Sequence, residues 1–368
     1  MKGEPIFIRH GRLHYFVREI FKRLRVPRTD ASHVADVLVA ADLAGVEGEG
    51  VARVPFFADR LSSELINPTP NIKIEELHRA SSVATVDGDN GLGPVVAAKA
   101  MELALRKAKR AGVGAVAARR SNDFGMAGYY ARMAFPERMI GVALSNAPPM
   151  VVPVYGTRAM YGVNPIAVAI PAAEGQSPFV LDMTTSATSK VRLEEACRNK
   201  ETIPRGWALD ASGQPTTDAE TALKALRLLP LGSRPETGAH KGYGLGLAVD
   251  ILCGVLSGGS FGLELSGAEG FKPAVAKIGH FFLAICADAF GPWVDFRNRI
   301  NSMLRKIAAS AAPGGPHVYY PGEPEYEIEQ DRRANGIPLP PHVSTRLEGL
   351  ARSLDIRDAW EHLLEGRK

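Results

Sequence analysis

The side chains best suited to acid–base chemistry lie in two glycine-rich stretches of the sequence. GVEGEGVARVP, over residues 45–55, carries Glu49 and Arg53, and SNDFGMAGYY, over residues 121–130, carries Asp123. A carboxyl group can exchange a proton near neutral pH when burial or a second carboxylate raises its pKa. A guanidinium binds a substrate carboxylate through two parallel hydrogen bonds. These residue types are typical of a site for a small anionic substrate.

HKGYGLG, over residues 240–246, places a lysine where we expect a helix to begin. Lys241 and the free backbone N–H groups of a helix N-terminus would suit a pyrophosphate. The closest match to GxGxxG is GVGAVA from Gly112, but it follows a helix and opens a strand, which is the wrong order for a dinucleotide fingerprint. The sequence also lacks GxxxxGK[ST], HExxH and GxSxG, the signatures of P-loop ATPases, zinc proteases and α/β-hydrolases.

Strands and helices are expected to alternate through the middle of the chain and to position these stretches. Apolar runs predict strands at residues 82–87, 113–118, 140–145, 166–170, 179–182 and 280–286. Apolar periodicity and capping residues predict helices over residues 30–45, 94–111, 241–256 and 296–308, and from residue 344 to the end of the chain. The proline- and glycine-rich stretch over residues 311–327 is predicted to be a loop.

The order of these elements predicts two domains in an α/β (α+β) fold. We expect a mainly helical domain built from both termini, residues 1–75 with residues 295–368. Between them we expect an α/β domain over residues 76–294. A chain of 368 residues is long enough for two cores.

Composition excludes several classes of protein. The chain is 45% hydrophobic and 23% charged with a formal charge of +4, and it has no dense basic face, so we expect no nucleic-acid partner. The N-terminus lacks the apolar core of a signal peptide, and the apolar stretch over residues 242–256 is too short to span a membrane. Cys197, Cys253 and Cys286 are far apart, so we expect no disulfide framework and no metal site. A cytoplasmic enzyme is the favoured interpretation.

Seven stretches occur in an order that is itself informative: GVEGEGVARVP, SNDFGMAGYY, YGVNPIAVAIP, LDMTTSATSKV, IPRGWALDASGQPTTD, HKGYGLGLAVDILCGVL and VYYPGEPEYE. Together they resemble the type-2 malate/L-lactate dehydrogenase family. That family includes ureidoglycolate and sulfolactate dehydrogenases, 2,3-diketogulonate reductase and piperideine-2-carboxylate reductases. The resemblance covers nearly the whole chain.

The resemblance implies an oxidoreductase that uses NAD or NADP on a small carboxylate substrate and assembles as a homodimer. It also implies a nicotinamide-binding domain that is not a Rossmann fold and contains a largely antiparallel sheet. Arg53 matches the family arginine for the substrate carboxylate. The positions that match the family's cofactor-binding residues are Asn146, Ala147, Asp182, Met183, Thr184, His240, Lys241 and Gly242. Arginines are too numerous to choose between NAD and NADP; the candidates are Arg119, Arg120, Arg158 and Arg192.

The sequence departs from the family at both positions of proton transfer. The family motifs read roughly Asp-Ser-His-Gly and Ser-Asn-His-Phe-Gly, whereas this chain has EGEG over residues 47–50 and SNDFG over residues 121–125. Carboxylates Glu49 and Asp123 therefore replace the two histidines of the family, one of which exchanges the proton. Reduction of a ketone needs an acid that can protonate an alkoxide near neutral pH, which histidine provides and an ordinary carboxylate does not.

Three hypotheses follow from this departure. The enzyme could act on a 2-imino acid or cyclic imine, whose protonated nitrogen a carboxylate would stabilise. It could act on a 2-oxo or 2-hydroxy acid, with Glu49 and Asp123 sharing a proton in one pocket. It could instead be a non-redox enzyme, such as a lyase or isomerase, or an inactive binding protein on the same scaffold. The substrate itself is not encoded in any motif.

Overall fold

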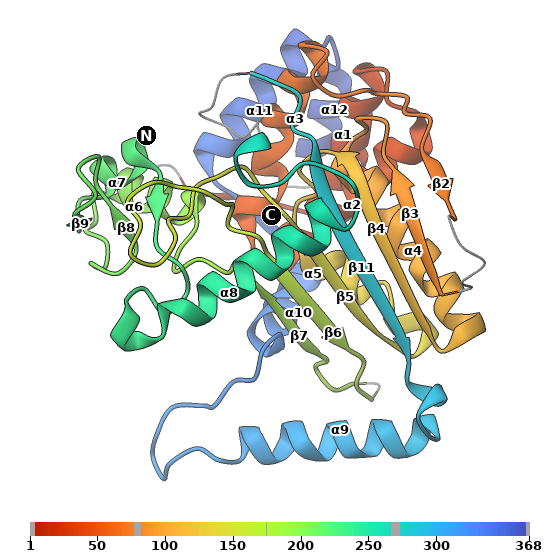
Figure 1. Cartoon of the computed structure of the whole chain (residues 1–368). Coiled ribbons are helices and arrows are strands. Elements are labelled where there is room, and N and C mark those ends of the chain that lie inside the picture. Colours follow the sequence, from red (N-terminus) through yellow and green to blue (C-terminus); the bar gives the residue numbers. More distant parts are fainter. Residues whose placement is uncertain (1–3, 77–81, 174, 266–272, 366–368) are drawn as a thin grey trace.

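A seven-stranded sheet forms the centre of the molecule in a computed structural model, which describes residues 4–76, 82–173, 175–265 and 273–365 (Figure 1). Its strands, in spatial order, are β2 (Lys73–Glu75), β3 (Val83–Asp87), β4 (Val113–Ser121), β11 (Ile278–Cys286), β5 (Met139–Ser145), β6 (Ile166–Ile170) and β7 (Phe179–Met183). Only the β3–β4 pair among these neighbours is parallel. The expectation of a largely antiparallel sheet that is not a Rossmann fold is confirmed.

The one parallel pair follows from the helix that connects its strands. Parallel neighbours need a crossover, and α4 (Gly93–Ala111) provides it. Pro94 lies in the first turn of α4, and Gly112 ends it in a left-handed conformation with φ of 79°. Both signals were read from the sequence, and the predicted helix is confirmed.

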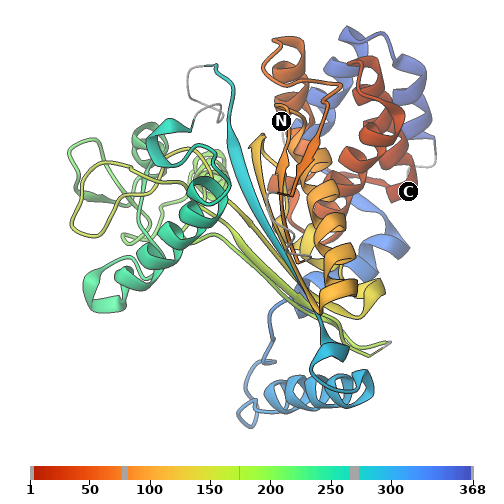
Figure 2. The same ribbon diagram turned by 45° about the vertical axis from the view of Figure 1, so that its right-hand side comes forward.

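The two faces of the sheet are covered by different helices. Alternate residues of β11 point to opposite faces, so Phe282 packs with α4 and α5 (Ala127–Arg132), whereas Phe281 packs against the helix that contains Val249 and Cys253. That second helix is α8 (Ala239–Asp250), which continues into a π-helical turn at Ile251–Val255. Figure 2 shows the sheet between these two layers.

Segments from both ends of the chain form one helical unit with its own core. Its helices are α1 (His10–Arg23), α2 (Arg28–Leu43), α3 (Val54–Ser62), α11 (Pro341–Ser353) and α12 (Arg357–Leu364), and β1 (Ile6–Ile8) pairs with β12 (Ile337–Leu339). Phe16, Phe21 and Leu347 are fully buried in this core. The predicted helical domain built from both termini is present, whereas the boundaries at residues 75 and 295 stay a prediction.

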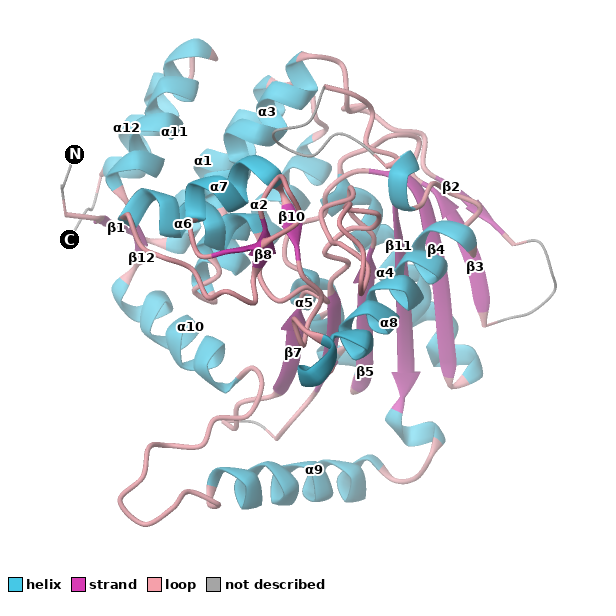
Figure 3. Ribbon diagram, turned by 60° about the vertical axis from the view of Figure 1, so that its left-hand side comes forward, coloured by secondary structure: helices cyan, strands magenta, loops and turns pink. Residues whose placement is uncertain are grey.

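A small lobe between β7 and α8 was not predicted. It contains α6 (Lys190–Asn199), α7 (Ala219–Ala225) and the short strands β8 (Ala208–Leu209), β9 (Pro215–Thr216) and β10 (Arg227–Leu228). Its core includes Tyr161, Leu193 and Leu228. Figure 3 shows this lobe beside α8, on the other side of the sheet from α4.

The long segment after β11 differs from the expectation in one respect. Helix α9 (Trp293–Ala308) packs through Ile300 and Leu304 against residues at the ends of β6 and β7. The predicted loop over residues 311–327 is wrong at its end, because α10 (Glu323–Asn335) begins inside it. Pro324 and acidic residues in the first turn are signals of a helix start. No helix of the described residues is long and apolar enough to cross a membrane.

Candidate active site

One cavity of about 900 Å³ collects most of the stretches that the sequence singled out. Most of its wall is formed by residues from six parts of the chain: Glu49 and Arg53, Asp123 to Gly128, Ser145 to Pro148, Pro178 and Val180 to Thr184, Ser186 to Arg192, and Tyr319 to Gly322 with Pro324 and Glu325. These parts come from the helical unit, the sheet edge, the small lobe and the turn before α10. The cavity is in the size range of ligand pockets.

Glu49 is held at the cavity wall by a tight turn after α2. The turn consists of two short 3-10 helices, Glu47–Glu49 and Val51–Arg53. The buried side chain of Asp42 accepts a hydrogen bond of 2.9 Å from the backbone N–H of Val51 and so fixes the turn from behind. A Cβ atom at Gly50 would lie 2.0 Å from Oδ1 of Asp42, so only glycine fits there.

Glu49 titrates near neutral pH because of its surroundings. Burial raises the pKa of Glu49 to about 7, and this shift is opposed by Arg53 and increased by the negative charges of Asp123 and Asp182. Part of the side chain remains open, on the side that lines the cavity. Glu49 is therefore a carboxyl group that can both donate and accept a proton at pH 7.

Arg53 and Asp123, which are 70 residues apart in the sequence, form an ion pair in the cavity wall. The pair joins Nη2 of Arg53 to Oδ2 of Asp123, while Oδ1 of Asp123 accepts a hydrogen bond of 2.9 Å from the backbone N–H of Gly125. The Arg53 guanidinium also lies over the ring of Phe56, 4.4 Å from the ring centroid. Both oxygens of Asp123 thus act as acceptors, as those of an ionised carboxylate do.

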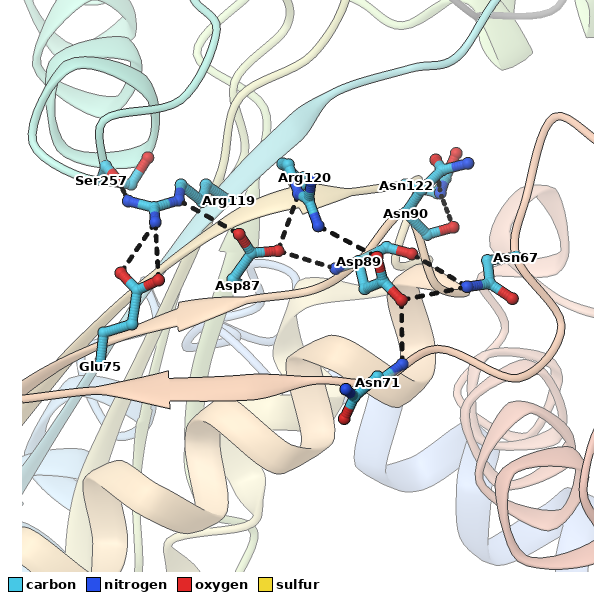
Figure 4. A network of polar contacts seen from close by, with 10 residues as sticks. All are labelled: Asn67, Asn71, Glu75, Asp87, Asp89, Asn90, Arg119, Arg120, Asn122 and Ser257. Atoms are coloured by element: carbon cyan, nitrogen blue, oxygen red, sulfur yellow. Dashed lines mark hydrogen bonds and ion pairs between the residues drawn. The ribbon is translucent and has the colours of Figure 1, made fainter.

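The loop that carries Asp123 is anchored from behind by a polar network (Figure 4). Nδ2 of Asn122 donates hydrogen bonds to the carbonyl oxygen of Gly91 at 2.8 Å and to Oδ1 of Asn90 at 3.1 Å. Arg120 joins the same region through Asp87 at 2.8 Å and Asp89 at 3.0 Å. The fully buried Asn122 therefore fixes the end of β4 to the loop before α4.

Three of the expected cofactor residues lie at the end of β7 and line the cavity: Asp182, Met183 and Thr184. Oδ2 of Asp182 accepts a hydrogen bond of 2.6 Å from the backbone N–H of Gly128. Although much of the Asp182 side chain is open to the cavity, the surrounding protein raises the pKa of Asp182 to about 6. The negative charge of Glu325, across the cavity, contributes to this shift.

Asn146 and Ala147 also line the cavity, at the end of β5. The Asn146 side chain is occupied within the protein, because it donates to Asp250 at 3.1 Å and to the carbonyl oxygen of Ser260 at 3.0 Å and accepts from the backbone of Gly279 at 2.8 Å. Asn146 thus shapes this part of the wall by holding its backbone, whereas Ala147 is partly open to the cavity.

The remaining expected cofactor residues do not line this cavity. His240 and Lys241 are exposed in the first turn of α8. Gly242 is buried, and a Cβ atom there would lie 2.3 Å from the carbonyl oxygen of Leu231, which itself lines the cavity. The close approach of α8 to Leu231 therefore requires a glycine, and it places the start of α8 one layer behind the cavity wall.

Several residues that shape the site could not be recognised from the sequence. Asp42 lies in the apolar run at the end of α2. An acidic residue among apolar ones was the signal that could have indicated its role. Glu325 belongs to a stretch that carried the family resemblance but was given no role in the site. The start of α6, with Ser189 as its N-cap, also lines the cavity. Among the described residues, no group of three or more His, Cys, Asp or Glu side chains could hold a metal ion.

A family model for malate/L-lactate dehydrogenase matches residues 8–348 of the chain. This protein belongs to the malate/L-lactate dehydrogenase family. A malate dehydrogenase from Pyrococcus abyssi is 41% identical over 347 residues, which is 94% of each chain. The solved structure of malate dehydrogenase from Pyrococcus horikoshii OT3 superposes with a TM-score of 0.87 at 37% identity and covers 96% of this chain and 98% of that one. The chain is therefore an enzyme of the dehydrogenase class.

More distant relatives are named for both nicotinamide cofactors. A ureidoglycolate dehydrogenase (NAD(+)) from Escherichia coli O157:H7 is 33% identical over 89% of this chain and 90% of its own. A (2R)-3-sulfolactate dehydrogenase (NADP(+)) from Chromohalobacter salexigens is 32% identical over 89% of this chain and 92% of its own. Each relative acts on a small substrate with a carboxylate, as its name states.

Proposed function

We propose that the protein is an NAD- or NADP-dependent dehydrogenase that interconverts a small 2-hydroxy acid and the corresponding 2-oxo acid, with Glu49 as the proton carrier. The observation that carries this proposal is the carboxyl group of Glu49, which faces the cavity with a pKa of about 7. It occupies the position at which the family has its first histidine. A group that titrates near pH 7 fulfils the same requirement as an imidazole.

Arg53 and Glu49 have separate roles in the proposed reaction. Arg53 binds the carboxylate of the substrate and so fixes its orientation. In oxidation, the hydroxyl proton of the substrate passes to the Glu49 carboxylate while the C–H bond breaks with its electron pair. In reduction, protonated Glu49 returns the proton to the carbonyl oxygen. When bound, the nicotinamide supplies the acceptor or donor of the hydride.

The cavity fits a cofactor of this kind. Its volume of about 900 Å³ exceeds the need of a small acid alone, and its wall carries backbone and small polar groups at Ala147 and Asp182 to Thr184. These are the groups on which the family rests its cofactor. We propose that these groups hold NAD or NADP, whereas His240, Lys241 and Gly242 lie outside the cavity wall and are left out of this proposal.

An imine substrate is the second candidate, because acidic side chains outnumber basic ones around the cavity. Arg53, Arg132 and Lys190 are each paired with an acid of the wall, at Asp123, Glu329 and Glu194 respectively. Glu49, Asp182 and Glu325 form no ion pair within the described structure, and they would favour a cationic iminium group. A protonated imine would not need Glu49 as an acid.

Parallel assays with reduced and oxidised cofactor test the proposal. Malate, sulfolactate and ureidoglycolate would be oxidised, and oxaloacetate and Δ1-piperideine-2-carboxylate reduced, with turnover followed by the near-ultraviolet absorbance of the reduced nicotinamide. Faster turnover of 2-hydroxy and 2-oxo acids supports the proposal, and faster turnover of the cyclic imine supports the second candidate. Cofactor binding without turnover of any substrate would favour a non-redox or inactive protein.

The assembly and location of the enzyme are part of the same proposal. We propose a homodimer in the cytoplasm, in keeping with the family resemblance and with three cysteines that form no disulfide in the described structure. Sedimentation of the purified protein measures the assembly directly, and a monomeric mass at micromolar concentration would contradict the dimer.

A further inference from the structure

His280 is a buried imidazole that lies directly behind the candidate active site and has no role in the chemistry described so far. It is fully inaccessible to solvent in β11, the strand between β4 and β5. The β4–β11 register shifts between the pairs Ile278–Ser121 and His280–Ala118, which marks a bulge in β4 at Arg119–Arg120. A Cβ atom at Gly279 would lie 2.0 Å from the carbonyl oxygen of Cys253, so the close approach of the π-helical turn to β11 requires a glycine there.

Each ring nitrogen of His280 contacts a serine at the end of a neighbouring strand. Nε2 lies 2.8 Å from Oγ of Ser121, the last residue of β4, and Nδ1 lies 2.9 Å from Oγ of Ser145, the last residue of β5. Both serines are buried, and each is followed by an asparagine that begins a loop of the cavity wall. His280 therefore bridges the two strand ends from which the Asp123 loop and the Asn146–Ala147 loop begin.

The hydrogen bonds of the serines indicate which ring nitrogen carries the proton. Oγ of Ser145 donates to the carbonyl oxygen of Asn146 at 2.9 Å, whereas the corresponding contact from Ser121 to Asn122 is 3.5 Å long. This difference favours the tautomer in which Ser145 uses its one proton on the backbone and accepts from Nδ1–H of His280. Ser121 is left to donate to Nε2, because a neutral imidazole has one donor and one acceptor.

The ring of His280 also supports the cavity wall by stacking. It lies parallel to the ring of Phe124, with centroids 4.6 Å apart and an interplanar angle of 5°. Tyr130 stacks on the same phenylalanine at 4.9 Å and donates its hydroxyl proton to the carbonyl oxygen of Phe124. Phe124 follows Asp123 directly, so the stack fixes the residue next to the ion pair with Arg53.

We propose that His280 is a positioning residue that holds the substrate loop (Asp123–Phe124) and the cofactor loop (Asn146–Ala147) at a fixed spacing through its two serine hydrogen bonds. Burial lowers the pKa of His280 to about 3, so the ring keeps one donor and one acceptor throughout the working pH range. The relation to catalysis rests on the proposed function, whereas the hydrogen-bond arrangement stands on the geometry alone.

The effect on catalysis is tested with His280→Phe and with the double variant Ser121→Ala/Ser145→Ala. Phenylalanine keeps a ring that can stack on Phe124 but removes both hydrogen bonds. Each loop would still bind its own ligand, so KM and the cofactor Kd should change less than about 3-fold while kcat falls about 10- to 100-fold. Combining all three substitutions should cost no more than either set alone, because they remove the same two bonds.

Ser257→Ala is the matched control. Ser257 is also buried, and it donates to backbone carbonyls without contact to His280. This variant should keep the wild-type kcat even where its melting temperature falls. A His280→Phe enzyme with a lower melting temperature and an unchanged kcat would overturn the proposal, because His280 would then only stabilise the fold.

Nitrogen-15 spectra of the histidine rings test the geometry without any assay of activity. The signal missing from His280→Phe identifies His280, which should carry its proton on Nδ1 and show no titration between about pH 5 and about pH 8. A proton on Nε2, or titration in that range, would overturn the assigned bridge. If the wild type turned over no substrate, the proposed function would fail, and these spectra would still decide the bridge.

Discussion

The guanidinium of Arg53 and the carboxylate of Asp123 are paired inside the cavity, so the group expected to bind the substrate carboxylate already faces an internal carboxylate. The histidine that the family resemblance implies at position 123 would remove this negative charge from beside the arginine. In the proposed mechanism, Asp123 therefore competes with the substrate for Arg53. This relationship makes Glu49, rather than Asp123, the better candidate for proton transfer.

Asp123→Asn is expected to strengthen substrate binding. Asparagine keeps an oxygen that can accept from the N–H of Gly125, so the loop should hold its shape, while the competing charge is removed. KM for a 2-oxo acid should fall roughly 3- to 30-fold, because a partly exposed ion pair between Arg53 and Asp123 contributes only a modest interaction energy. The value of kcat should change less than about 10-fold. Steady-state kinetics measure both. Complete loss of turnover at saturating substrate would instead identify Asp123 as the proton donor.

Arg53→Lys should weaken substrate binding, because an ammonium group cannot make two parallel hydrogen bonds to a carboxylate. We expect KM for the acid to rise about 10- to 100-fold with little change in cofactor Kd. Arg60→Lys is the matched control, since Arg60 also lies near the ring of Phe56 but does not line the cavity. Equal effects of the two substitutions would argue against a direct contact between Arg53 and substrate.

Asp42 should make the fold less stable as the pH rises. Burial raises the pKa of Asp42 from its ordinary 3.8 to about 8, so between these values the folded state holds a proton that the unfolded state has lost. The free energy of unfolding therefore falls as pH increases through this window. Asp42→Asn removes this dependence and should raise the melting temperature at pH 8 by about 1–2 °C for each kcal/mol recovered. Thermal melts at several pH values that show the same slope for both proteins would refute this role.

Arg192 is the arginine best placed to distinguish NADP from NAD. Arg119 is held by Glu75 and Arg120 by Asp87, as Figure 4 shows, whereas Arg192 lies in the first turn of α6 and lines the cavity. Arg192→Ala should raise the Kd for NADPH about 10-fold and the Kd for NADH less than about 3-fold, as measured by fluorescence titration.

Arg198→Ala serves as the control for that titration. Arg198 is an exposed arginine in the last turn of the same helix and does not line the cavity. Its removal should leave both affinities unchanged. Identical losses for NADH and NADPH in Arg192→Ala would show that Arg192 does not contact the additional phosphate.

Much of the central architecture could be predicted from the sequence, because its signals are local. Apolar runs identified the long strands, and Pro94 with Gly112 delimited α4. The small lobe could not be found in this way, because strands of two residues, such as Ala208–Leu209, are too short to show a period. The start of α10 at Glu323 was missed because its proline was read as a loop signal.

The residues of the site could be predicted from the sequence, but their contacts with one another could not. Family motifs indicated Glu49, Arg53 and Asp123, and the structure places all three on one cavity. The pairing of Arg53 with Asp123 depends on how the helical unit packs against the end of β4, which no local pattern encodes. The serine bridge of His280 likewise depends on the order of three strands that are far apart in the sequence.

The pH dependence of turnover in Glu49→Gln is the most direct test of the account. In the wild type, oxidation of a 2-hydroxy acid should rise and reduction of the 2-oxo acid should fall as the pH passes through about 7, because oxidation needs the Glu49 carboxylate and reduction its protonated form. Glu49→Gln should lose this transition and about 10²- to 10⁴-fold in kcat. Asp182→Asn should keep a transition but move it to lower pH, since the negative charge of Asp182 contributes to the raised pKa of Glu49. A Glu49→Gln enzyme that retained the wild-type rate and pH profile would contradict the assignment of Glu49 as the proton carrier.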